Sequence, residues 1–299
     1  LRRSRAGMTW YPDKVMEKSK PSDPFHDYCL WPYSRPADIM AGGLRTSALL
    51  YKTFEIAGLG RAALAYCDAV QKRWGKFQTV WGVKWADGKF SWEFYFYDYA
   101  RDDRKLGMTD YLRTTTGIIK CDLEPDDTLP YFMFSVEIDE HVLNGSPLDQ
   151  IDIYMGNPGS SVSSGICYGL TATQLEMRNF YFFFSANRER QQIIDKLNES
   201  IHLPYQNTNL NDLLWPEMKG VETIVLSNKR FNDGIYFSRI RATQLEYFLH
   251  RLKYPKELIQ FLSDQKGKFD HHLFDVGWDY DVDQNGTVTP QKGSFYGVL

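Results

Sequence analysis

The sequence predicts an α+β protein: a closed antiparallel β-barrel of about ten strands, built from hairpins, with helices around the outside. Three observations predict it. The apolar period changes from 3.6 residues to 2 after Trp74, strand-like segments come in pairs separated by turn residues, and helical segments separate several of these pairs. Because so many strands without a long exposed edge favour closure, we expect the helices to lie outside the barrel.

The N-terminal 43 residues are rich in proline, tryptophan and charged residues. We therefore expect residues 1–43 to form an irregular arm against a single barrel domain of residues 44–299. Four segments have helical spacing: 44–57, 61–74, 188–200 and 242–263, the last of which contains Pro255. Since proline removes a helical hydrogen bond, the fourth helix is expected to kink or split there.

Strand-like alternation recurs between the helical segments. It predicts five hairpins, pairing 77–85 with 89–99, 131–139 with 150–155, 166–171 with 177–184, 222–226 with 235–241, and 271–281 with 287–298. Turn dipeptides suited to positive φ angles mark four of the connections: Asp87-Gly88, Asn144-Gly145, Asp233-Gly234 and Asn285-Gly286.

Alternation also sorts the side chains of each strand onto two faces. In segment 89–99, four aromatic residues beginning with Phe90 share one face, and Ser91, Glu93, Tyr95 and Tyr97 share the other. If the barrel closes with its helices outside, the second face points inward. Glu93 would then be a partly desolvated carboxylate that accepts a proton or a hydrogen bond from an indole or phenol. Without closure it is an ordinary solvent-facing residue.

Composition argues against several classes of function. The net charge of −3 does not suit nucleic-acid binding, which needs a basic surface. No apolar run approaches the ~18 residues that span a bilayer, so a membrane partner is not expected. Four cysteines without a C-x-x-C pair indicate free thiols in a reducing, cytoplasmic compartment, with two disulfides in a secreted protein as the alternative. The aromatic content of 15% suits a pocket for flat or unsaturated ligands.

Two patterns with metal-binding residues do not carry a metal site. The segment from Asp281 to Gly286 begins like an EF-hand loop, but Lys292 stands where a bidentate glutamate is required. His271 and His272 are adjacent on a strand and so point to opposite faces. We therefore expect no resident metal.

Three short segments resemble the soluble aromatic prenyltransferases of the ABBA (αββα) barrel family. They are Phe90–Phe94 (FSWEF), Met177–Phe182 (MRNFYF) and Gln291–Tyr296 (QKGSFY), and the resemblance extends over roughly residues 45–299. It implies transfer of a prenyl group from an allylic diphosphate to an electron-rich indole or phenol in natural-product biosynthesis. It implies no required cofactor, Mg²⁺ as an optional companion of the diphosphate, and a monomer or homodimer without nucleic-acid partners.

The same resemblance assigns roles to residues. Glu93 orients or deprotonates the aromatic acceptor. Basic residues contact the diphosphate: Arg104, Arg178, Arg239 and Lys292. Lys84 is a further substrate-binding residue. Tyrosines shield the allylic cation or line the substrate site: Tyr95, Tyr97, Tyr154, Tyr181, Tyr236 and Tyr296.

The sequence departs from the family pattern at two carboxylates. Asp152 stands where a lysine is expected, and Glu137 adds a second negative charge to the predicted lumen, so a diphosphate would be repelled unless Mg²⁺ intervened. Two other functions therefore stay open. One is a diphosphate-independent condensation or cyclisation of an indole or amino-acid substrate with Glu93 as base, and the other is a ligand-binding barrel without chemistry.

Overall fold

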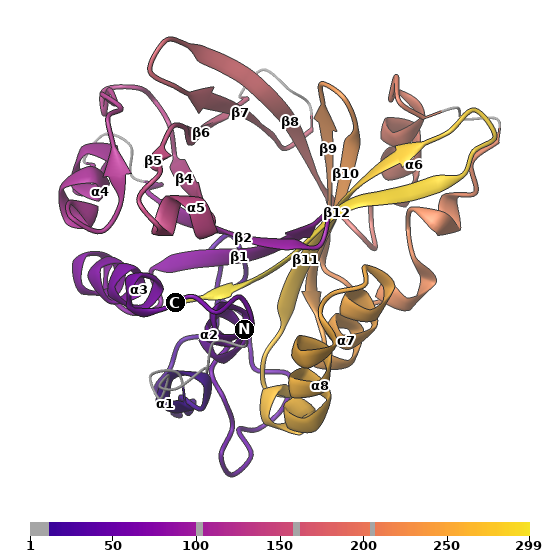
Figure 1. The fold of residues 1–299 in the computed structure, drawn as a ribbon. Coiled ribbons are helices and arrows are strands. Elements are labelled where there is room, and N and C mark those ends of the chain that lie inside the picture. The colour runs from indigo at the N-terminus through magenta and orange to yellow at the C-terminus, as the bar shows by residue number, and fades with distance from the viewer. Residues whose placement is uncertain (1–11, 100–103, 158–161, 204–206) are drawn as a thin grey trace, which may run out of the picture.

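The computed structural model describes residues 12–99, 104–157, 162–203 and 207–299. Ten antiparallel strands close into a barrel in the order β1-β12-β11-β10-β9-β8-β7-β6-β4-β2 (Figure 1). The strands are β1 (Thr79–Ala86), β2 (Lys89–Tyr97), β4 (Met133–Ile138), β6 (Ile151–Gly156), β7 (Ser164–Leu170), β8 (Leu175–Ser185), β9 (Thr223–Lys229), β10 (Asp233–Ile240), β11 (Phe274–Val282) and β12 (Val288–Val298). The predicted α+β barrel is confirmed.

All five predicted strand pairings are present, but two of the connections differ from the prediction. Asp87 and Gly88 have φ angles of 50° and 75°, as their turn requires. Between β4 and β6, however, the chain forms the short helix α5 (Glu140–Leu143) and a strand, β5 (Pro147–Leu148), in place of a tight turn. Asp233 and Gly234 lie inside β10, because β9 extends to Lys229 and the turn falls on residues 230–232.

Helices lie outside the ring of strands in Figure 1. The remaining helices are α1 (Pro12–Val15), α2 (Ser47–Ile56), α3 (Arg61–Trp74), α4 (Met108–Thr115), α6 (Arg190–Asn198), α7 (Ala242–Arg251) and α8 (Lys256–Gln265), with short 3₁₀ turns at Leu210–Asp212, Pro216–Met218 and Lys266–Phe269. The fourth predicted helix is split as expected, since α8 begins directly after Pro255. A small parallel pair, β3 (Lys120–Cys121) with β5, lies apart from the barrel sheet.

The apolar face of β2 shows why the barrel has a polar interior. Trp92 donates its indole N–H to Thr53 Oγ1 of α2 at 2.8 Å, and Phe94 packs edge-on against Tyr66 of α3. Since these apolar side chains are buried under the helices, the alternate residues of the strand point into the barrel. The inward direction predicted for Glu93, Tyr95 and Tyr97 follows from this arrangement.

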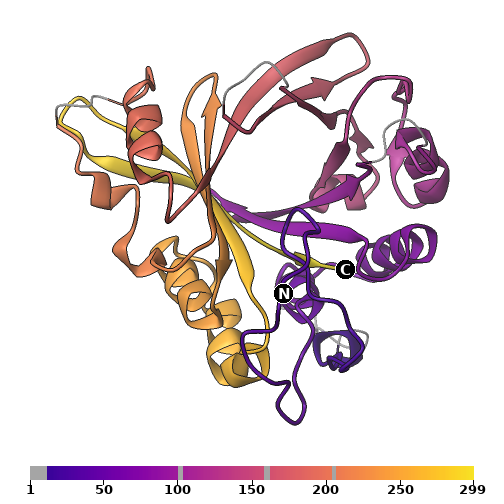
Figure 2. The ribbon, with the colours of Figure 1, turned by 180° about the vertical axis from the view of Figure 1, so that it is seen from behind.

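The described part of the N-terminal arm, from Pro12 onward, is irregular apart from α1. Arg45 holds it through an ion pair of 2.8 Å with Asp23 and a hydrogen bond to Glu17. His271 also contacts it, with Nε2 2.8 Å from Ser19 Oγ. Figure 2 shows the indigo arm looping up in front of the barrel strands. None of the helices that the structure describes has the length and apolar character needed to cross a membrane.

Candidate functional site

The barrel encloses a cavity of about 450 Å³. The inward residues of the strands sort the lining into three successive layers, as Glu93, Tyr95 and Tyr97 do along β2. A charged layer lies toward one end and consists of Lys84, Glu93, Glu137, Asp152, Arg178, Lys229, Asp279 and Lys292. A tyrosine ring lies in the middle and consists of Tyr95, Tyr154, Tyr181, Tyr236 and Tyr296. A floor lies at the other end and consists of Tyr28, Cys29, Val80, Tyr97, Met133, Phe183 and Val225.

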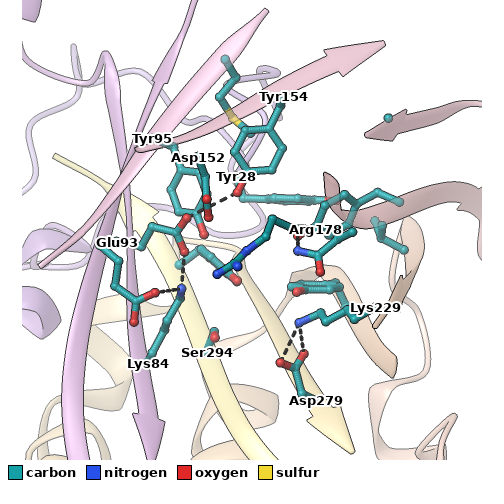
Figure 3. A pocket seen from close by; sticks show the side chains of 18 of the residues that line it. Tyr28, Lys84, Glu93, Tyr95, Asp152, Tyr154, Arg178, Lys229, Asp279 and Ser294 are labelled. Carbon is teal, nitrogen blue, oxygen red and sulfur yellow. Dashed lines mark hydrogen bonds and ion pairs between the residues drawn. The ribbon is translucent and has the colours of Figure 1, made fainter. Parts of the chain in front are cut away.

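One cluster of the charged layer is centred on Lys84 of β1. Its Nζ lies 2.5 Å from Glu93 Oε2 and 2.5 Å from Glu137 Oε2 (Figure 3). Burial opposes the charge of Lys84, but the two carboxylates outweigh it and raise the pKa of the lysine well above its usual range. Ser135 donates its hydroxyl to Glu93 Oε1, so both oxygens of this buried carboxylate are held. Glu93 is thereby fixed in one orientation toward the lumen.

A second cluster lies across the cavity, on β9, β11 and β12. Lys229 Nζ is 2.6 Å from both oxygens of Asp279 (Figure 3). Lys292 Nζ is 2.9 Å from Asp279 Oδ2. Burial alone would raise the pKa of Asp279, but the two ammonium groups hold it at about 2. Two cations on one carboxylate leave this cluster with a net positive charge.

Arginines extend the positive charge toward the open rim of the cavity. Arg178 lies between the two clusters in Figure 3, and its Nη1 is 3.8 Å from Glu176. Arg230 lies 3.3 Å from the same glutamate and is 73% exposed, while its neighbour Phe231 is 79% exposed. One side of the charged layer is therefore net positive, whereas Lys84 with three carboxylates leaves the opposite side net negative.

Asp152 of β6 completes the negative side. Its Oδ1 accepts a hydrogen bond of 2.6 Å from Gln150 Nε2. Burial, together with the charge of Glu93, raises the pKa of Asp152 from 3.8 to about 6. This carboxyl therefore titrates near neutral pH and changes the net charge of the cavity there.

The raised pKa of Asp152 has a consequence for stability. Because the folded protein favours the protonated form, this group costs no stability below pH ~4 and costs up to about 3 kcal/mol as pH rises through ~6. Asp152→Asn is therefore expected to raise Tm by a few degrees at pH 8 and to leave it unchanged at pH 4 in thermal unfolding. Asp195 on α6 is the matched control, since it accepts a similar bond of 2.8 Å from Gln191 but is exposed. If both variants changed Tm equally at both pH values, the raised pKa of Asp152 would be contradicted.

The tyrosine ring is a closed cycle of aromatic contacts. Centroid distances are 6.4 Å for Tyr95–Tyr154, 6.1 Å for Tyr154–Tyr181, 6.1 Å for Tyr181–Tyr236, 6.5 Å for Tyr236–Tyr296 and 6.0 Å for Tyr296–Tyr95. Burial raises the pKa of each phenol, so all five stay neutral at physiological pH. The ring presents neutral π faces to the lumen without adding negative charge.

Each tyrosine of the ring stands beside a small residue on the next strand. The register pairs Tyr296 with Gly82, Tyr236 with Gly277, Tyr181 with Ser227, Tyr154 with Cys167 and Tyr95 with Ser135. At two of these positions no side chain fits. A β-carbon on Gly82 would lie 2.7 Å from the Tyr296 ring, and one on Gly277 would lie 2.1 Å from the Tyr236 ring. The rings therefore lie along the wall and leave the centre of the barrel open.

Ten of the twelve side chains predicted to form the site line the cavity: Glu93, Lys84, Arg178, Lys292, Tyr95, Tyr97, Tyr154, Tyr181, Tyr236 and Tyr296. The structure thus brings them together, while their roles remain predictions.

Arg104 and Arg239 do not line the cavity. Arg104 donates to the backbone carbonyls of Asp127 and Leu129 and lies 3.5 Å from the ring centroid of Tyr131, so it fixes a loop outside the barrel. Arg239 pairs with Asp27 of the arm at 3.1 Å. Both guanidinium groups are thus committed to the protein's own structure, and neither is positioned to contact a ligand in the lumen.

Lys229, Asp279 and Tyr28 also line the cavity but were not predicted from the sequence. Lys229 lies beyond the predicted end of its strand, although the alternation Val225, Ser227, Lys229 would have placed it inward had the strand been extended. Asp279 lies in a predicted strand whose faces had not been assigned. Tyr28 belongs to the arm, which has no periodicity to read.

The described residues include no group of three or more His, Cys, Asp or Glu side chains placed to hold a metal ion. All four cysteines are free thiols.

Comparisons with known proteins give distant relations. No protein-family model matches the chain. A JmjC domain-containing protein of Acanthamoeba polyphaga mimivirus is 23% identical over 301 aligned residues, which cover 86% of this chain and 47% of that protein. The chain thus spans about half the length of the curated relative it matches. A solved 5-dimethylallyltryptophan synthase from Streptomyces coelicolor superposes with a TM-score of 0.46 at 10% identity, over 83% of this chain and 94% of that chain.

Proposed function

We propose that the protein transfers a prenyl group from an allylic diphosphate to an electron-rich aromatic small molecule inside the barrel. The observation that carries the proposal is the closed ring of five neutral tyrosines beneath a layer that is net positive on one side and holds a fixed carboxylate on the other. Prenyl transfer needs these three parts: an anion site, a cation shield and an acceptor site.

The positive side of the charged layer suits the diphosphate. Lys229, Lys292 and Arg178 supply charge-assisted donors that stabilise the leaving group as the C–O bond breaks and the bonding electron pair departs with the diphosphate. Asp279 lies between the two lysines and holds them together. The leaving group would therefore lie at the open end of the cavity.

The tyrosine ring suits the allylic cation that this ionisation leaves. A cation within ~6 Å of an aromatic face is attracted by the ring quadrupole, and the attraction is larger where water is excluded. Because the phenols are neutral, they stabilise the cation without capturing it as a phenolate would. A wall of rings also keeps water, a competing nucleophile, away from the cation.

Glu93 suits the aromatic acceptor. Its carboxylate lies directly above Tyr95 on the same inward face of β2 and is oriented by Lys84 and Ser135. There it accepts a hydrogen bond from the N–H or O–H of an indole or phenol and increases the electron density of the ring. After the ring carbon attacks the cation, Glu93 accepts the proton that restores aromaticity.

One observation favours a second candidate function. Each lysine of the charged layer is already paired with a carboxylate: Lys84 with Glu93 and Glu137, and Lys229 and Lys292 with Asp279. A lumen in which positive and negative charges are paired in this way also suits a zwitterionic amino-acid or indole substrate that reacts without a diphosphate. In that reaction Glu93 would act as the base of a condensation or cyclisation.

A thermal-shift titration separates the two candidates. Non-hydrolysable dimethylallyl and geranyl thiolodiphosphates, with and without Mg²⁺, are expected to raise Tm in a concentration-dependent way. Inorganic sulfate at matched ionic strength is the control for a general anion effect. If no diphosphate raises Tm beyond sulfate under either condition, the prenyl-transfer proposal is wrong and amino-acid and indole ligands become the probes to use.

A further inference from the structure

The N-terminal arm contributes to the cavity at the end opposite the charged layer. Tyr28 and Cys29 line the lumen together with Val80, Phe183 and Val225, which come from three different strands. The Tyr28 ring lies 6.0 Å from Tyr296 and thus continues the aromatic wall inward. A segment far from the barrel strands in sequence therefore forms part of the ligand-facing surface.

This segment is anchored to the barrel by two buried carboxyl groups, Asp27 and Asp275, and by Arg239. The backbone N–H of Tyr28 donates to Asp275 Oδ2 at 2.8 Å, and that of Arg239 donates to Asp275 Oδ1 at 2.8 Å. The Arg239 guanidinium in turn lies 3.1 Å from Asp27 Oδ2. The other oxygen of Asp27 accepts from the backbone N–H of Cys29 and of Trp31, which closes a tight turn.

The barrel itself is distorted where the arm attaches. The pairing of β10 with β11 shifts register between Phe237 and Ile240, and Arg239 has a φ of 61°, a left-handed conformation that non-glycine residues seldom adopt. The irregularity turns the N–H of Arg239 toward Asp275. A left-handed conformation of this kind persists where surrounding contacts stabilise it. Here those contacts are the bonds of Arg239 to Asp275 and Asp27, which also hold the arm.

Two tyrosines fix the arm from the other side. Tyr97 donates its hydroxyl to the carbonyl of Tyr28, and Tyr99 donates to the carbonyl of Cys29 at 2.5 Å. The backbone of the segment is therefore held on both sides of the barrel end. Its side chains meet the lumen in a fixed position.

We infer that Tyr28 and Cys29 form the closed floor of the ligand cavity and that Tyr28 sets the length of hydrocarbon chain the cavity accepts. The floor is lined largely by apolar side chains, whereas the opposite end holds the lysines. A ligand with an anionic head and a hydrocarbon tail fits this polarity in one orientation, with its tail against Tyr28. The inference rests on the proposed function in placing the anion at Lys229 and Lys292.

Alkyl phosphates test the floor without any allylic chemistry. In a series from butyl to decyl phosphate, each methylene that reaches the apolar floor is expected to tighten binding by about fourfold. In the wild-type protein the affinity should stop increasing at the chain length that meets Tyr28, which we call the cut-off. In Tyr28→Ala the cut-off should move to longer chains, and in Cys29→Phe it should move to shorter chains. Calorimetric Kd values across the series give the cut-off directly.

Trp31→Ala is the matched control, because Trp31 is an aromatic residue of the same segment that is 57% exposed and does not line the cavity. Its cut-off should equal that of the wild type. An unchanged cut-off in both Tyr28→Ala and Cys29→Phe, or no binding of any alkyl phosphate, would overturn the inference. A cut-off that moves as expected while no prenyl diphosphate yields product would uphold the floor and reject prenyl transfer. The two proposals can therefore fail separately, and Cys29→Phe keeps the test valid if Tyr28→Ala does not fold.

Discussion

Replacing Glu93 by glutamine is expected to lower turnover by about 10²- to 10⁴-fold while leaving the barrel folded. The amide keeps the size of the side chain. Its oxygen can accept from Lys84, which now binds Glu93 Oε2, and its NH2 group can donate to the hydroxyl of Ser135, which now binds Oε1. It cannot take up the proton that the acceptor ring must lose. The measurement is prenyl transfer under saturating diphosphate, with Tm recorded for both proteins.

Glu137→Gln is the matched control for this variant. Glu137 binds the same lysine at the same distance of 2.5 Å, but its side chain is 49% exposed at the rim. We expect it to lose less than tenfold in turnover, since the acceptor lies deeper in the cavity. A Glu93→Gln protein with full activity would exclude the role of base, and equal losses in both variants would indicate that Lys84, and not Glu93, is the group that matters.

Lys229→Gln is expected to weaken diphosphate binding by about 10- to 100-fold, because a charge-assisted hydrogen bond contributes ~1.5–3 kcal/mol. The substitution leaves Asp279 paired with Lys292 alone and removes the net positive charge of that cluster. The measurement is the Kd of geranyl thiolodiphosphate by calorimetry at fixed ionic strength.

Lys266→Gln controls for the loss of an ion pair as such. Lys266 lies 2.6 Å from Glu246, as close as Lys229 lies to Asp279, but at the start of the 3₁₀ turn that follows α8, outside the barrel. Its Kd for the diphosphate should equal that of the wild type. Adding Asp279→Asn to Lys229→Gln should recover part of the lost affinity, since the remaining Lys292 is then unopposed. A diphosphate affinity unaffected by Lys229→Gln would place the anion elsewhere.

The fold was predictable because its signals are local. The change of apolar period after Trp74 and the turn at Asp87-Gly88 each act over a few residues, and the structure follows both. Asp233-Gly234 was misassigned as a turn for a reason that is not local. Gly234 is required inside β10 because a β-carbon there would meet Asp279 and Ser227, which belong to other strands.

The site was predictable where barrel closure alone decides the direction of a side chain. Closure turns Glu93, Tyr95 and Tyr97 inward, and alternation then predicts which residues of the other strands also point inward. The pairing of Lys229 with Asp279 joins residues that are 50 positions apart, so the register of several strands must be known first. The floor could not be predicted from the sequence for another reason. The position of Tyr28 depends on hydrogen bonds to the carboxyl groups of Asp27 and Asp275 and not on any repeating pattern.

The tyrosine ring is built from a pattern that each of the five hairpins repeats, with one small residue and one tyrosine per hairpin. In every hairpin of the barrel the first strand supplies the small residue and the second supplies the phenol: Gly82 and Tyr95, Ser135 and Tyr154, Cys167 and Tyr181, Ser227 and Tyr236, Gly277 and Tyr296. In each hairpin the tyrosine stands two residues beyond the register partner of the small residue. The ring therefore repeats one hairpin pattern five times, and because the linkers between hairpins differ in length, the repeat has no fixed spacing in the sequence.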